Sequence, residues 1–150
     1  MFGKLFNKKK DSNDNWSLAQ AEDKNTGAVS MFLKNIAPSI QIGDENYPYV
    51  SYLTFHYEKY NKTGLPDSKE EEEFSNIQDI DLPLFEKDNL AIHLASVTQN
   101  GIRDYIFQTS NPEKFLDFAE IIRNKYPKYD VDCEVIKDLD WSHYIELPGD

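Results

Sequence analysis

The segment LAIHLASVTQNGIRDYIFQT, Leu90 to Thr109, decides the fold because it predicts two adjacent antiparallel strands. Asn100-Gly101 lies at its centre, and both residues tolerate the positive φ that a two-residue hairpin turn requires. With that loop Gln99 pairs with Ile102. The same register pairs Leu94 with Phe107 and Ser96 with Tyr105 on one face, and Ala95 with Ile106 and Val97 with Asp104 on the other. Apolar residues then lie on both faces, so a cover beyond one helical layer is expected on part of the second face.

A helix and a further strand are predicted after the hairpin. Asn111 is a good N-cap and Pro112 suits the first helical position. Apolar residues then recur at helical spacing: Phe115, Phe118, Ala119, Ile122 and Tyr126. The strand from Tyr129 to Ile136 alternates apolar residues with Asp130, Asp132 and Glu134, which places these three carboxylates on one face. Cys133 lies on the apolar face and is interpreted as a packed structural thiol.

The residues before the hairpin predict a strand and a helix. Tyr47 to Tyr60 is rich in β-branched and aromatic residues. After Gly64-Leu65-Pro66, a helix is expected from about Ser68 to Phe85, with Asp67 or Ser68 as its N-cap. Acidic residues occupy its first turn, and a kink or end is expected at Pro83. From Tyr47 onward the order is strand, helix, strand, strand, helix, strand. This order predicts an α+β, ferredoxin-like sandwich in which two helices cover one face of an antiparallel sheet.

Two short strands, residues 16–24 and 29–34, are predicted to form an N-terminal β-hairpin. This hairpin either extends the sheet or covers its other face. Residues 1–15 are expected to be a flexible basic and polar leader. Residues 16–150 are then a single domain, with a C-terminal tail from about residue 138.

Length and composition describe one globular domain. The chain has 150 residues, of which 39% are hydrophobic and 13% aromatic, enough for an independent core. No stretch reaches the roughly 20 apolar residues of a membrane-spanning helix, and the first residues lack the features of a signal peptide. A cytoplasmic location is therefore expected. A single cysteine excludes an internal disulfide.

The charge balance bears on the partner. Acidic residues outnumber basic residues by 27 to 16, which gives a net charge of −11. Such a surface repels phosphates, so nucleic acid is not an expected partner. A membrane surface is not expected either, because the basic N-terminal residues offer one short turn with three apolar residues, Phe2, Leu5 and Phe6, which binds weakly. The same field accelerates encounter with a basic protein surface. A protein partner, and a basic one in particular, is the expectation.

No sequence motif for a phosphate loop, a zinc helix or a nucleophile elbow is present, so no cofactor, metal or catalytic residue is assigned. His56 and His93 could share one sheet face and, with Asp130 or Asp132, form a weak metal site. The other interpretation is that both are partly exposed strand residues.

The tail carries Trp141-Ser142-His143-Tyr144, in which a serine adjoins a histidine. Neighbouring side chains generally diverge, so this pair is a poor nucleophile and base. Either the aromatic rings dock the tail onto the domain or they form a patch for a partner. The candidate partner-binding residues are Asp130, Asp132, Glu134, Trp141, His143 and Tyr144.

Several segments together resemble bacterial proteins of the domain of unknown function 695. These are Trp16, Tyr47-Pro48-Tyr49, Gly64-Leu65-Pro66, residues 98–104, Tyr129 to Val135, and the closing Asp138-Leu139-Asp140-Trp141-Ser142-His143-Tyr144. The likeness spans about Trp16 to Pro148, and its closing segment is the most specific. That family in turn resembles the regulator of ribonuclease activity B, a ferredoxin-like protein inhibitor. The resemblance implies no catalytic residue.

Two function hypotheses remain open. The first is a non-enzymatic protein-binding regulator or inhibitor with an acidic surface, a class that includes immunity proteins for basic toxins. The second is a small enzyme or small-ligand binder with a pocket between the sheet and the N-terminal hairpin. A pocket with convergent polar groups would favour the second.

Overall fold

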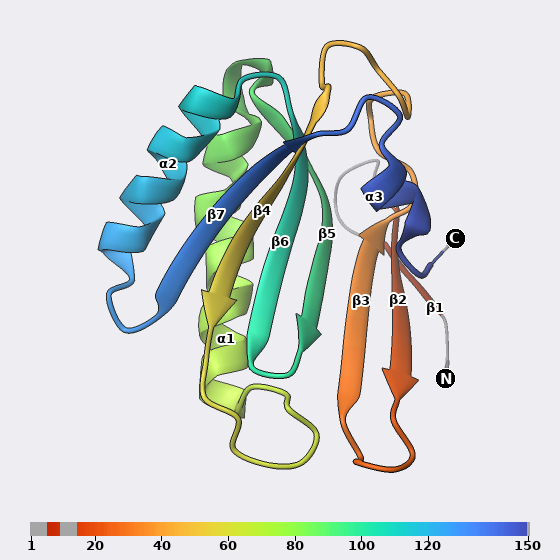
Figure 1. Ribbon diagram of the computed structural model, residues 1–150, viewed down its shortest axis with the longest axis vertical. Helices are drawn as coiled ribbons and strands as arrows, with labels where there is room; N and C mark the ends of the chain where they lie inside the picture. Colours follow the sequence, from red (N-terminus) through yellow and green to blue (C-terminus); the bar gives the residue numbers. More distant parts are fainter. Residues whose placement is uncertain (1–5, 10–14, 150) are drawn as a thin grey trace.

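The computed structural model describes residues 6–9 and 15–149, which form a mixed α and β structure around one antiparallel sheet (Figure 1). The sheet has seven strands in the order β1-β2-β3-β5-β6-β4-β7. The strands are β1 (Phe6–Lys9), β2 (Asn15–Glu22), β3 (Val29–Asn35), β4 (Tyr49–His56), β5 (Ala91–Gln99), β6 (Ile102–Thr109) and β7 (Asp130–Lys137). Every neighbouring pair is antiparallel, as the sequence predicted.

Helices α1 (Ser68–Asn76) and α2 (Pro112–Lys125) begin at the predicted caps. The side chain of Asp67 accepts a hydrogen bond from the Glu70 backbone N–H at 2.8 Å, and Asn111 accepts one from Lys114 at 3.1 Å. These bonds satisfy N–H groups that the first turn leaves without helical partners.

Both helices pack on the same face of the sheet, which we call the helical face (Figure 1). The core between them and β4, β6 and β7 is largely aromatic, with Phe55, Phe74, Tyr105, Phe107 and Phe115 all fully buried. The opposite face lacks α1 and α2. A short C-terminal helix, α3 (Ser142–Glu146), covers only part of it.

The hairpin register is as predicted from Gln99 back to Ala95, and then it shifts. A β-bulge between His93 and Ala95 places His93, rather than Leu94, opposite Phe107. The extra residue turns the His93 ring into the helical face and Leu94 to the opposite face. The predicted pairing of Leu94 with Phe107 is therefore wrong.

The N-terminal hairpin extends the sheet rather than covering its second face, because β3 pairs with β5 from Met31↔Thr98 to Lys34↔Ala95. The predicted leader, residues 1–15, lies largely outside the described residues. Its described part differs from a leader, since Phe6–Lys9 forms β1 and pairs with β2.

The helix expected from Ser68 to Phe85 is shorter than predicted. α1 ends at Asn76, and the chain continues through a π-helical segment, Ile77–Asp81, and a 3₁₀ segment, Leu82–Asn89. Pro83 lies in the first turn of the 3₁₀ segment, where its missing N–H costs no helical bond. None of the helices in the described part of the chain is long and apolar enough to cross a membrane.

Candidate functional site

Four carboxylates gather on the face opposite the helices, and we call this surface the acidic face: Asp104, Asp130, Asp132 and Glu134. Asp104 lies on β6 and the other three lie on β7, with β4 between these two strands. Asp104 and Asp132 lie in one row, on either side of Thr54. Paired residues in a sheet share a face, so the register places the four acids together. The predicted alternation on β7 is confirmed, since Asp130, Asp132 and Glu134 are all exposed.

Few groups on the acidic face balance its charge. The His56 Nε2 atom lies 2.8 Å from Asp132 Oδ2, and the Thr54 hydroxyl donates to Asp104. Burial raises the pKa of Asp104, although the Thr54 hydrogen bond and the nearby His56 lower it. Of the ion pairs between described residues, only the one between His56 and Asp132 involves this face. The face therefore offers acceptors to which no Lys or Arg of the described residues is bound.

The segment Asp138 to Tyr144, which is the most specific part of the family resemblance, holds the C-terminal tail in place. Asp138 accepts hydrogen bonds from Ser142 N, from Ser142 Oγ at 2.6 Å and from His143 N. Burial raises the pKa of Asp138, but these three bonds outweigh it and hold the pKa below its usual value. The Asp138 carboxylate thus satisfies the first two backbone N–H groups of α3, whose N-cap position is Trp141.

Two aromatic rings anchor this tail to the domain. Trp141 is fully buried and its Nε1 donates to the Tyr47 carbonyl at 3.1 Å. The Tyr144 hydroxyl donates to the Asn35 carbonyl at 2.6 Å. The Lys34 Nζ atom lies over the Tyr144 ring and donates to the Leu147 carbonyl. Docking of the tail is confirmed, and neither ring has a surface to offer a partner in this conformation.

Ser142 and His143 do not form a nucleophile and base. The Ser142 hydroxyl bonds to Asp138, whereas His143 Nδ1 lies 2.6 Å from the Tyr52 hydroxyl. Burial, followed by the charges of Asp104 and other acids, raises the pKa of Tyr52 to about 12. His143 remains half-buried beside the acidic face.

The two strand histidines are not on one sheet face, which corrects the candidate metal site. His93 lies in the helical face, where its ring centroid is 5.1 Å from those of Trp16 and Phe107. His56 lies on the acidic face. Among the described residues no group of three or more His, Cys, Asp or Glu side chains could hold a metal ion. The β5 bulge is the cause of the separation.

Cys133 packs against the core, as predicted. Burial raises the pKa of its thiol to about 12, so the thiolate is scarce near neutral pH. This is a structural thiol.

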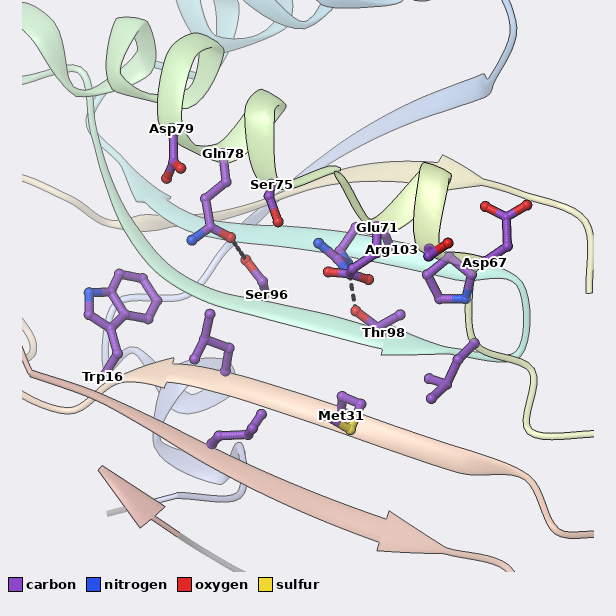
Figure 2. Close-up of a pocket in the computed structure, with 15 residues that line it drawn as sticks. Trp16, Met31, Asp67, Glu71, Ser75, Gln78, Asp79, Ser96, Thr98 and Arg103 are labelled. Carbon is purple, nitrogen blue, oxygen red and sulfur yellow. Dashed lines mark hydrogen bonds and ion pairs between the residues drawn. The ribbon is translucent and has the colours of Figure 1, made fainter. Parts of the chain in front are cut away.

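A groove of about 710 Å³ lies on the helical face between α1 and the N-terminal hairpin (Figure 2). Apolar side chains from β2 and β3 form one side, and polar side chains from α1 form the other. The Gln78 amide accepts a hydrogen bond from the Ser96 hydroxyl at 2.9 Å, and its nitrogen points toward Trp16 (Figure 2). The pocket considered from the sequence lay between the sheet and the N-terminal hairpin, whereas this groove lies between α1 and the hairpin, because the hairpin is part of the sheet.

Arg103 lies at the base of this groove and was missed by the sequence analysis. It is 5% exposed, donates to both carboxylate oxygens of Glu71 at 2.7 Å and donates through Nε to Thr98. Its guanidinium lies over the Phe74 ring at 4.9 Å. The pKa of Arg103 is raised because Tyr105 and Glu71 outweigh its burial. The only signal in the sequence was its place on the same strand face as Tyr105 and Phe107.

Comparison with known protein families shows that most of the chain matches one family model. The model of a family of unknown function (DUF695) matches residues 14–147. The chain belongs to this family. Neither a curated protein nor a solved structure matches it. In this family member the matched range includes β2 through α3, and so contains the acidic face, the groove and the docked tail.

Proposed function

We propose that this protein is a non-enzymatic binding module that regulates or inhibits a basic protein partner through the acidic face. The observation that carries the proposal is the set of four carboxylates on β6 and β7, none of which is paired with a Lys or Arg of the described residues. Complementary charge on a partner would replace the missing Lys and Arg. A cytoplasmic location and a bacterial source are parts of the same proposal.

The carboxylate of Asp104 lowers the stability of the folded protein, and a purely structural role does not explain its position. Its carboxylate lies on a central strand, burial raises its pKa, and its hydrogen bond comes from a neutral Thr54 hydroxyl. A desolvated acid without a bound cation destabilises the folded state at neutral pH. Residues that lower the stability of the folded state are found most often at functional surfaces.

The fold supports the same class of function. The strand order β5-β6-β4-β7, with α1 and α2 on one face, is the order of a split βαβ unit. We infer a ferredoxin-like unit extended by the N-terminal hairpin. The resemblance to a ribonuclease regulator of that architecture, inferred from the sequence alone, is in keeping with a regulator or inhibitor, although fold alone does not decide function.

Affinity capture with matched charge variants tests the proposal. The test variant is Asp130→Asn, Asp132→Asn, Glu134→Gln, and the control is Glu113→Gln, Asp117→Asn, Glu120→Gln on α2. Both remove the same charge from exposed positions. We expect a basic protein to be captured by the wild type and the control and lost by the test variant. Equal capture by both variants would contradict the proposal.

A ligand-binding role is the second candidate, and the groove beside α1 is the observation that favours it. Its volume of about 710 Å³ is in the range of small-ligand sites. No nucleophile and base meet among the groove residues, which are mostly apolar or already bonded. Binding rather than catalysis is therefore the better proposal for the groove as well.

A further inference from the structure

The helices α1 and α2 do not cover all the strands of the sheet. α2 contacts β7 and β4. α1 reaches β6 through the ion pair of Glu71 with Arg103, and the π-helical segment after α1 reaches β5 through the hydrogen bond between Gln78 and Ser96. Strands lie about 4.8 Å apart and packed helices about 8–10 Å apart, so one helix covers about two strands. The pair β3 and β2 continues the sheet beyond α1, and within the described residues no helix lies over its helical face (Figure 1).

The uncovered strands are apolar on that face. Leu18 of β2 and Leu33 of β3 are paired neighbours, and Met31 follows on the same side of β3. All three line the groove and are half-buried rather than buried. A polar surface would be expected here if the face met only water. These apolar side chains lie where a further helix beside α1 would pack on the sheet.

The α1 side of the groove is acidic. Asp67, Glu71 and Asp79 line it, and their spacing follows the length of α1 and the segment after it (Figure 2). Glu71 is bound to Arg103, whereas Asp79 is exposed and takes part in no ion pair with a described residue. A chain entering the groove would therefore meet apolar side chains below and carboxylates beside it.

We propose that this groove binds an amphipathic helix of a partner protein, with its apolar face on Leu18, Met31 and Leu33 and its Lys or Arg residues toward Asp67 and Asp79. The occupant is a helix because the groove continues the helical layer beside α1. It is basic because the bordering charges are acidic. This site lies on the helical face, so it does not depend on the acidic face described above.

A synthetic amphipathic helical peptide with leucines on one face and lysines along the flank is the probe, and its glutamate analogue is the control. Peptide anisotropy gives the affinity, and the Met31 methyl signal reports the site. We expect the lysine peptide to bind at least tenfold tighter than its analogue, to gain helicity and to shift the Met31 signal. An unbound lysine peptide, an unshifted methyl signal or a peptide bound in extended form would overturn the proposal.

Variants separate the groove from general attraction to an acidic protein. Met31→Asp adds a negative charge, so general attraction would strengthen binding, whereas the groove predicts a loss of at least tenfold. Leu116→Asp on α2 makes the same kind of change at a 44% exposed residue and should not weaken binding. Asp79→Lys should weaken the lysine peptide, and Asp117→Lys should not. Equal effects of Met31→Asp and Leu116→Asp, or of Asp79→Lys and Asp117→Lys, would refute binding of a partner's helix in this groove. A dimer of this chain that Met31→Asp dissociates would refute it too.

Discussion

Replacement of Trp141 by alanine tests how the tail is held, and the structure sets its magnitude. The ring is fully buried, and its N–H bonds to the Tyr47 carbonyl. Trp141 has a left-handed backbone with φ of 57°. Alanine carries a similar conformational cost because it also has a Cβ atom, so the loss comes from the ring. Removing a buried aromatic ring costs about 3–5 kcal/mol of unfolding free energy.

Thermal unfolding measured by circular dichroism converts this loss into a temperature. For a chain of this size about 1 kcal/mol corresponds to 2–4 °C, so Trp141→Ala should lower Tm by roughly 6–20 °C. A chain ending at Lys137 should lose at least as much, because Tyr144 is removed too. Ile145→Ala, at a 56% exposed position of α3, is the control and should change Tm little. A Trp141→Ala protein that melts with the wild type would refute the docked tail.

Three further predictions concern the core, the start of α3 and the thiol. Phe115→Ala should lower the unfolding free energy by about 3–5 kcal/mol in urea titrations, because its ring is fully buried. Leu116→Ala, at the exposed neighbouring position, should lower it far less. Equal urea midpoints for the two variants would mean that the buried and exposed faces of α2 are misassigned. Asp138→Asn should cost about 1 kcal/mol at neutral pH, because a hydrogen bond to a charged acceptor contributes roughly 1.5–3 kcal/mol and one to a neutral acceptor about 0.5–1.5 kcal/mol. Because the folded pKa of Asp138 is lowered, its contribution is complete above an unfolded pKa of about 4 and is lost as pH falls through the folded value, so melting curves of wild type and variant should converge in acid. Cys133 should react with a thiol reagent at pH 8 far more slowly than the same thiol in the denatured chain, since burial raises its pKa to about 12, and similar rates would show an accessible thiolate.

Features governed by nearby residues could be predicted from the sequence. The Asn100-Gly101 turn fixes the register as far as Ala95, and the caps Asp67 and Asn111 fix where α1 and α2 begin. The acidic row on β7 followed from simple alternation. Each of these depends on residues a few positions apart, and the structure retains them.

Features that depend on contacts between residues far apart in the sequence could not be predicted from the sequence. The bulge before Ala95 inserts no glycine or other local marker, yet it reverses the face of His93 and so removes the predicted metal site. Arg103 is buried only because Glu71 and the Phe74 ring come from α1. The groove arises where the hairpin pairs with β5, and the sequence left that placement open between two alternatives.

The association rate of the captured partner at several ionic strengths tests the acidic face most directly. Raising ionic strength from about 0.01 M to about 1 M shrinks the Debye length from about 30 Å to about 3 Å. For the wild type and the α2 control we expect the association rate to fall at least tenfold over this range, with a much smaller change in dissociation. Neutralising Asp130, Asp132 and Glu134 should remove most of that salt dependence. An association rate that is insensitive to salt, or equally sensitive in both variants, would contradict the account.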